Sequence, residues 1–185
     1  MSQQFTFPAT SLKNLLKWTC VLGVTFSLKH TAPLHSAVLY WDDNGNTVGT
    51  STTPNGTWGT SAFWSSSSTG TSTTDDRTVT SRDDLHFSAG TTATGDCTIT
   101  VNTSQQARKL NFEEGNVTFT GTGSIHLNTT TGGINFLSAT TPNVVTIHTD
   151  LSVGAAIVID TQTLSGNELI LGTGTFSRGN NGTVN

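Results

Sequence analysis

Carboxylates are the side chains of this 185-residue chain that could do chemistry, and most of them are neighbours in the sequence. Hydrolysis of a glycosidic bond requires two carboxyl groups that face one groove at a separation of about 5 to 10 Å. Neighbours on a strand project to opposite faces, so an adjacent pair cannot supply both groups. The sequence therefore predicts no catalytic residue and no enzyme. The acidic pairs are Asp42/Asp43, Asp75/Asp76, Asp83/Asp84 and Glu113/Glu114, and we expect the last of these at a solvated corner.

Two histidines are spaced so that a metal pair has to be considered. His126 and His148 stand nearly one repeat apart in the sequence, and each is flanked by residues that we expect to face inward. Both imidazoles should therefore point outward. We expect them on different strands, where they cannot bind one ion.

Asp42, Asn44 and Asn46 resemble the start of a calcium-binding loop. Such a loop needs glycine at its sixth position and a bidentate acid at its twelfth. Thr47 and Thr53 stand there instead. Asn44 and the glycine after it are better explained as a tight turn. We predict no metal and no cofactor.

The tryptophans gather near the start of the chain and admit two interpretations. Trp41, Trp58 and Trp64 lie close together in the sequence, beside the only tyrosine, Tyr40. Such bulky rings can cover the open first layer of a repetitive core. They can also form an exposed platform on which sugar rings stack, which would make the chain a carbohydrate-binding module. The first interpretation predicts buried indoles and the second predicts exposed ones.

Recurring apolar pairs predict the elements that must position these side chains. The two members of each pair are two positions apart, which is the period of a strand with one buried face. The pairs recur at almost one interval, and a repeat of this length, built from units that cannot bury their own apolar face, is typical of a solenoid. The pairs predicted to form a core ladder are Leu110/Phe112, Ile134/Phe136 and Ile157/Ile159.

Further apolar couples fill each interval, so that about three short strands make one repeat. We therefore predict an all-β chain folded as a parallel β-helix. Between the pairs, Asn111 and Asn135 are placed to form a side-chain ladder. Outward threonines should cover the exposed faces: Thr98, Thr100, Thr118, Thr120 and Thr146.

Composition narrows the possible partners. Hydrophobic residues make up 33% of the chain and charged residues 11%. From residue 38 onward five basic residues stand against 12 acidic ones, a balance of −7 (5 − 12). This disfavours nucleic acid and anionic membrane as partners. Cys97 lies on the apolar face of a predicted strand, so we expect a small core residue without reactivity.

Residues 1–37 have the features of a signal peptide. Two lysines precede a short apolar run at residues 18–28, and the segment contains no acid. The run is shorter than the ~20 residues of a spanning helix, so we predict no membrane span in the mature chain. An N-terminal strand or amphipathic helix of the folded protein is the alternative. Residues 38–84 then form the aromatic N-terminal cap with a polar surface loop, and residues 85–185 form the coils, which we expect to continue in a longer parent protein.

Several segments resemble bacterial autotransporter-associated β-strand repeat proteins. They are YWDDNG, GTW, DDLHFSAGT, TITV, LNFEEGNVTFTGTGSIHL and a GGI coil, and together they span roughly residues 39–176. The resemblance implies a right-handed parallel β-helix in a secreted or surface-displayed passenger, an adhesin or rigid stalk without catalysis. Its partners would be surface glycans or other cell-surface proteins. A carbohydrate-binding module and a β-helical polysaccharide lyase or glycosidase are the alternatives. The repeat typical of the family lacks its lysine here, in LILGTGTF.

Overall fold

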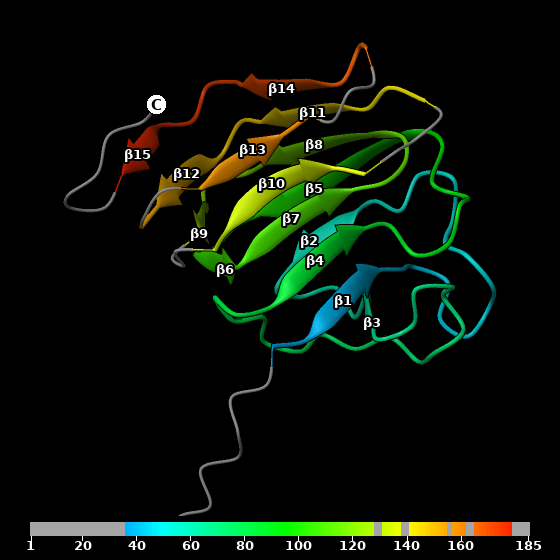
Figure 1. The fold of residues 1–185 in the computed structure, drawn as a ribbon. Coiled ribbons are helices and arrows are strands. Elements are labelled where there is room, and N and C mark those ends of the chain that lie inside the picture. Colours follow the sequence, from blue (N-terminus) through cyan, green and yellow to red (C-terminus); the bar gives the residue numbers. More distant parts are fainter. Residues whose placement is uncertain (1–35, 128–130, 138–140, 155–156, 162–164, 179–185) are drawn as a thin grey trace, which may run out of the picture. The chain divides into compact units, whose positions relative to one another are not determined.

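The structure is a computed structural model that describes residues 36–127, 131–137, 141–154, 157–161 and 165–178 (Figure 1). All described residues belong to one compact unit, His35–Asn185, so the predicted signal peptide lies almost wholly outside them. The described elements are all strands, and they form three sheets.

Each sheet collects strands from successive parts of the chain, as Figure 1 shows. Sheet A has the order β13-β10-β7-β4-β1-β3, sheet B the order β14-β11-β8-β5-β2, and sheet C the order β15-β12-β9-β6. From β4 to β15 the chain visits sheets A, B and C in turn. The bounds in sheet A are β1 (Val38–Trp41), β3 (Trp64–Ser65), β4 (Asp84–Phe87), β7 (Lys109–Phe112), β10 (Gly133–Phe136) and β13 (Val158–Asp160).

The remaining strands make up the other two sheets. Sheet B consists of β2 (Gly56–Trp58), β5 (Asp96–Val101), β8 (Asn116–Thr120), β11 (Val144–Ile147) and β14 (Glu168–Leu171). Sheet C consists of β6 (Gln105–Ala107), β9 (Ser124–Leu127), β12 (Asp150–Val153) and β15 (Phe176–Arg178). Every strand pair is parallel except β1 with β3.

The register of sheet A confirms most of the predicted ladder. Leu85, Leu110 and Ile134 follow one another at equivalent positions of neighbouring strands. Phe112 pairs with Phe136 in the same way. These side chains are buried, because alternate residues of each strand point into the space between the sheets. The three sheets therefore share one apolar core.

The predicted register of the last apolar pair, Ile157/Ile159, is wrong by two residues, which is one period of a strand. Ile134 pairs with Ile159, whereas Ile157 precedes the strand and is only partly buried. The turn from sheet A to sheet B explains the shift, because it is longer between Ile134 and Val145 than between the equivalent positions Leu110 and Val117. Shorter turns elsewhere in that coil offset only part of the difference.

Burial also stops before the end of the ladder. Ile159 is 47% exposed although its register partner Ile134 is fully buried. β13 has a neighbour on one side only among the described strands. The prediction that Ile159 belongs to the buried core is therefore wrong, because no described layer covers it.

The opposite end of the core is filled by tryptophan. Trp41, Trp58 and Trp64 are all 0–1% exposed. Their rings meet edge to face, with centroids 5.0 Å apart for Trp41 and Trp64 and 5.8 Å apart for Trp58 and Trp64. β3, which carries Trp64, lies antiparallel against the outer edge of β1. The interpretation of these indoles as an exposed ligand contact is wrong, because each ring is inside the core.

The polar segment after β3 is only partly at the surface. The sequence predicts a polar surface loop within residues 38–84, yet Ser65 and Gly70 of this loop are buried. Gly70 has a positive φ and lies against the backbone of Gly49. Serine and threonine hydroxyls of this loop bond to one another, as Ser67 does with Thr69 and Thr71. Two loops distant in sequence are thus packed together at this end.

Candidate functional site

A groove of about 550 Å³ lies where the chain turns from sheet A to sheet B. Three successive turns contribute to it, so its residues are distant in sequence but adjacent in the stack. The lining mixes two carboxylates, several hydroxyls and two apolar side chains: Gly90, Thr91, Thr94, Glu113, Glu114, Gly115, Asn116, Leu137, Thr141 and Pro142. Such a surface can accept hydrogen bonds from hydroxyl or amino groups and contact an apolar ring face.

Glu113 is held in place at the rim of this groove. Its Oε1 lies 2.6 Å from Nδ1 of His86. The imidazole in turn packs on the ring of Tyr40, with centroids 4.7 Å apart. Burial and the charge of Glu113 raise the pKa of the Tyr40 hydroxyl. Because Glu113 is anchored, its carboxylate presents a fixed acceptor to the groove.

Glu114 points the other way, into the protein. It lines a small interior cavity beside Ser88 and Cys97. Its Oε2 is buried without a hydrogen-bond partner among the described residues. Burial raises the pKa of Glu114. The predicted solvated corner is therefore wrong for this residue, since the turn at Gly115 folds its side chain inward.

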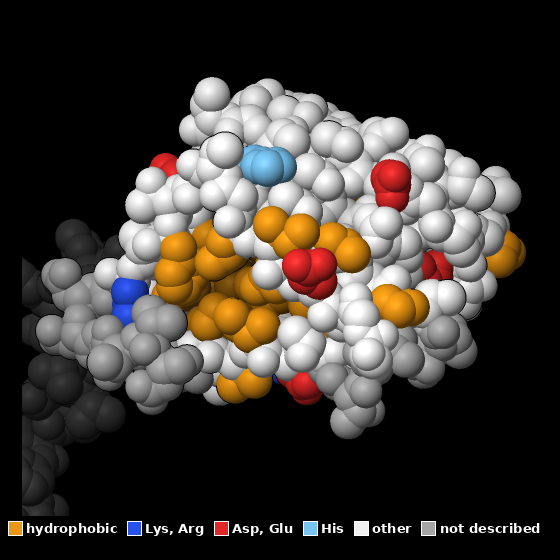
Figure 2. Space-filling view, turned by 90° about the horizontal axis from the view of Figure 1, so that it is seen from above, with side chains coloured by type: hydrophobic (Ala, Val, Ile, Leu, Met, Phe, Trp, Pro, Cys, Tyr) orange, Lys and Arg blue, Asp and Glu red, His pale blue; other side chains and the backbone are white. Residues whose placement is uncertain are grey.

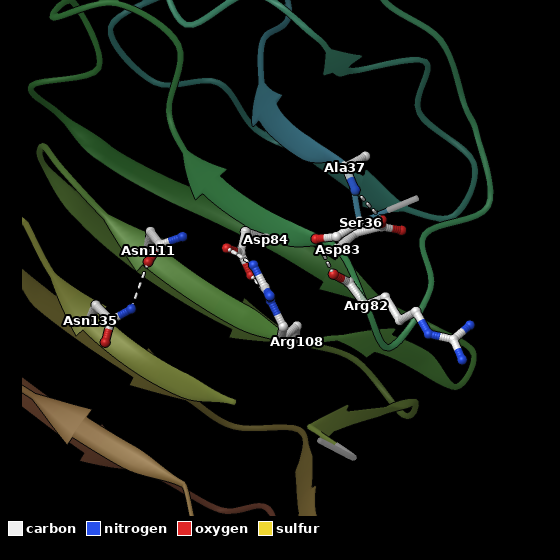
Figure 3. Close-up of polar contacts among 8 residues, drawn as sticks. All are labelled: Ser36, Ala37, Arg82, Asp83, Asp84, Arg108, Asn111 and Asn135. Atoms are coloured by element: carbon white, nitrogen blue, oxygen red, sulfur yellow. Dashed lines mark hydrogen bonds and ion pairs between the residues drawn. The ribbon is translucent and has the colours of Figure 1, made fainter. Parts of the chain in front are cut away.

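The acidic neighbours at β4 also divide between two tasks, as Figure 3 shows. Asp83 accepts a hydrogen bond from the backbone N–H of Ala37 at 2.8 Å. Asp84 forms a two-pronged ion pair with Arg108, with nitrogen–oxygen distances of 2.7 and 2.5 Å. Each carboxylate fastens a different neighbouring segment. The two carboxylates therefore have different partners.

Asp42 and Asp43 stabilise a turn in the segment predicted to resemble a calcium loop. Oδ1 of Asp42 accepts a hydrogen bond from the N–H of Asn44 at 3.0 Å. Asp43 accepts hydrogen bonds from Thr50 and Ser51. Within the described ranges, no three His, Cys, Asp or Glu side chains are grouped so that they could hold a metal ion. The hydrogen bond between Asp42 and Asn44 is therefore explained by a turn, as the sequence predicts.

The two histidines considered as a metal pair lie apart. Nε2 of His126 is 2.8 Å from Oγ of Ser124, on sheet C. His148 follows β11 of sheet B, and its Nδ1 accepts a hydrogen bond from the N–H of Thr173 at 3.4 Å. The two residues therefore do not share a strand, although the prediction of a strand position is wrong for His148, which lies in the turn after β11.

Polar ladders run along the faces of the sheets that point away from the core, and one member, Asn111, is buried there. The side-chain amide of Asn135 donates to Oδ1 of Asn111 at 2.7 Å, so the predicted asparagine ladder is confirmed (Figure 3). On sheet B two rows of threonine point outward at equivalent positions of successive strands, which confirms the prediction for this face. The rows are Thr57–Thr100–Thr120 and Thr98–Thr118–Thr146.

Cys97 is a core residue, as predicted. It is 5% exposed, and its Sγ donates to the carbonyl of Pro54 at 3.2 Å. Burial, followed by the charge of Asp43, raises the pKa of this thiol to about 12. A thiol with so high a pKa is protonated at neutral pH and a poor nucleophile.

Sequence reasoning missed the groove and the contact between His86 and Glu113 at its rim. A signal for the pair is present in the spacing. Asn111 is the register partner of His86, and Glu113 stands one strand period beyond Asn111. Side chains so related are diagonal neighbours on adjacent parallel strands.

Comparisons with models of protein families, with curated proteins and with solved structures found no match to this chain. The described residues include no helix that is long and apolar enough to cross a membrane.

Proposed function

We propose that this chain is a right-handed parallel β-helix that serves as a rigid, adhesive segment of an exported bacterial protein. The observation that carries the proposal is the parallel register of sheet A, in which Leu110, Ile134 and Ile159 are successive partners. A chain that visits three sheets in turn and stacks each strand on its predecessor has the connectivity of a β-helix. Crossover connections between parallel strands are right-handed in almost all proteins, which supports the handedness.

Stiffness follows from the way in which the layers are joined. Each layer is bonded to the next through three sets of parallel backbone hydrogen bonds and through a common apolar core. Side-chain contacts between layers, such as Asn111–Asn135 and Asp84–Arg108, add to this on the outside. Bending such a stack would strain all three sheets, so the arrangement suits a spacer that holds its length.

The outer face of sheet B supports the adhesive part of the proposal. Its threonine rows present hydroxyls at the spacing of neighbouring parallel strands, roughly 4.8 Å. Repeated hydroxyls can bond to surface glycans or to another protein surface, and the anchored Glu113 adds a fixed acceptor at the groove. We propose surface glycans as the first partner class.

The export part rests on the sequence of residues 1–37 and on the resemblance to autotransporter-associated repeat proteins. We propose that this segment directs the chain out of the cytoplasm and that the folded part is displayed at the cell surface.

The two rival functions require features that the described residues lack. A carbohydrate-binding platform of Trp41, Trp58 and Trp64 would need exposed indoles, and these are buried. A β-helical glycosidase would need two carboxyl groups that face one groove. The groove at Glu113 is lined by two, but these point in different directions.

Pulling single molecules from their ends tests the rod. A stack of coils should unravel in steps, each releasing roughly 80–90 Å, which is the extended length of one coil. One abrupt extension with no steps of that size would contradict the stack. Ile134→Ala should weaken an inner step, and Ile159→Ala, at the outer edge, should not.

Limited proteolysis of intact bacteria tests the display. A tagged copy of the full chain should be cleaved by a protease added outside the cells. Full protection of the tagged chain, together with its recovery from the cytoplasmic fraction, would contradict export and leave the rod proposal untouched.

A further inference from the structure

Two Asn-Gly dipeptides occur among the described residues, and their surroundings differ. Asn44-Gly45 belongs to the turn that Asp42 stabilises, and Asn55-Gly56 leads into β2. Both lie at the tryptophan-filled end of the core, opposite to the end that Figure 2 shows, where hydrophobic side chains gather at the surface. Because glycine has no Cβ, its backbone nitrogen can approach the side chain of the asparagine before it.

The reaction open to such a dipeptide is deamidation. The backbone nitrogen of the glycine attacks the side-chain amide carbon of the asparagine, a new C–N bond forms, and the bond from that carbon to its amide nitrogen breaks. The glycine nitrogen gives up its proton and ammonia leaves, so that a succinimide ring remains. Water then opens the ring at either carbonyl carbon and produces aspartate or isoaspartate.

The surroundings of Asn44 leave this reaction unobstructed. The residue is exposed, and none of the described residues bonds to its side-chain amide. Its backbone N–H donates to Oδ1 of Asp42 at 3.0 Å, which holds the residue on one side. Gly45 has a φ of +71°, and a Cβ built there would meet nothing within 4 Å. The backbone can therefore rearrange for ring closure without displacing a packed neighbour.

The surroundings of Asn55 oppose the same reaction. The residue is also exposed, but its Oδ1 accepts a hydrogen bond from the N–H of Thr98 at 2.6 Å. Gly56 pairs with Ile99 of β5, and a Cβ built there would lie 2.7 Å from the ring of Phe63. Ring closure would have to break the bond to Thr98 and move Gly56 within this packed layer.

We propose that Asn44 is a site of spontaneous deamidation in the folded chain and that the fold protects Asn55. Exposure does not distinguish the two residues, because both are exposed. The hydrogen bond to the Asn55 amide and the packing of the glycine after it distinguish them. This inference does not depend on the role or location proposed above.

The modification places a further carboxylate in the turn, directly after Asp42 and Asp43. The chain, whose net charge is −4, becomes more acidic. Isoaspartate also routes the backbone through the former side chain, which lengthens the link between residue 44 and Gly49. The N–H of Gly49 donates to the carbonyl of Thr69, so the longer link bears on the contact between the two loops.

Storage of the purified full chain at neutral pH and physiological temperature tests the proposal. Anion exchange separates the more acidic products, and peptide mapping with fragmentation identifies each converted residue. We expect conversion at Asn44 to be at least about tenfold faster than at Asn55, because ring closure at Asn55 first requires a local opening of β2 from β5. Gly45→Ala should slow conversion at Asn44, since its Cβ hinders the attacking nitrogen.

The unfolded chain is the matched control. In concentrated urea both dipeptides lose their surroundings, and their rates of conversion should agree within about threefold. Circular dichroism would verify that the chain stored without urea stays folded. Equal rates at Asn44 and Asn55 in the folded chain, no conversion at Asn44 while the unfolded chain converts, or a large difference between the two in urea would overturn the proposal.

Discussion

The two ends of the core show what a repetitive β structure needs in order to finish a layer. At the first end, three buried tryptophans fill the space between sheets A and B, and β3 lies antiparallel along the edge of β1. At the last end the same inward alternation continues, but Ile159 and Leu171 face solvent. Alternation therefore directs a side chain toward the core, and only a further layer removes it from water.

The difference is one of energy as well as geometry. Burying an aliphatic or aromatic side chain contributes about 1.5–3 kcal/mol relative to leaving it exposed. Residues of the first end receive this contribution in full, and their counterparts at the last end receive part of it. Two predictions test that contrast and two test the packing and the charges of the first end, all measured by urea unfolding.

The largest effect is expected at the aromatic end. Trp64→Ala should lower the free energy of unfolding by about 3–5 kcal/mol, because it opens a cavity against Trp41, Trp58 and Phe87. Phe176→Ala, at the partly buried end of sheet C, is the comparison and should cost about half as much or less. Equal losses at the two positions would remove the distinction between the ends.

A single ladder offers the closest comparison. Ile134 and Ile159 are register partners of the same residue type, one fully buried and one 47% exposed. Ile134→Ala should cost about 2–5 kcal/mol, and Ile159→Ala less than about 1 kcal/mol. If Ile159→Ala proved as costly as its partner, then β13 would be covered by something in this chain.

Two glycines at the first end allow the cost of a steric clash to be distinguished from the cost of a left-handed backbone conformation. Gly70 and Gly45 both have positive φ, but a Cβ at Gly70 would collide with the backbone of Gly49, whereas a Cβ at Gly45 would meet nothing within 4 Å. Gly45→Ala should cost about 1 kcal/mol for the left-handed conformation alone. Gly70→Ala should cost clearly more, and a similar loss at both positions would mean that the two loops are not packed together.

The smallest effect is a dependence on pH. Asp42 is fully buried with Oδ2 unpartnered among the described residues, and burial raises its pKa. As the pH falls through that raised pKa, the folded chain takes up a proton that the unfolded chain does not. The contribution of Asp42 to stability therefore rises from pH 7 down to its ordinary pKa of 3.8. Asp42→Asn should flatten this rise.

Asp43 is the control, because its pKa is shifted in the direction opposite to that of Asp42. Burial acts to raise the pKa of Asp43, but hydrogen bonds from Ser51 and Thr50 outweigh it and lower the pKa. Its contribution is present above pH 3.8 and is lost as the pH falls through the lowered value. Identical pH profiles for Asp42→Asn and Asp43→Asn would contradict these environments.

Much of the fold could be predicted from alternation alone. The pairing of Phe112 with Phe136, the asparagine ladder and the outward threonines follow from a strand period of two and a nearly constant coil length. The position of Ile159 did not follow, because turns vary in length independently of strands. A register that is counted from a constant repeat length is therefore wrong by the second repeat.

The aromatic end could not be resolved from sequence, because tryptophan suits both a core and a sugar-binding platform. Only the antiparallel return at β3, which turns Trp64 inward, decides between the two. The groove was missed for a different reason. Its residues come from three turns, and turns carry no periodicity that would place Leu137 beside Glu113.

The most direct test of the stack is to detect the backbone hydrogen bonds between layers by NMR couplings across them, in the isotope-labelled full chain. The N–H of Leu137 should couple to the carbonyl of Phe112, that of Gly133 to Arg108, and that of His148 to Phe119. The two partners of each bond belong to successive coils, so each coupling spans a whole repeat of the sequence. Couplings that instead join residues of one hairpin, a few positions apart, would contradict the parallel stack.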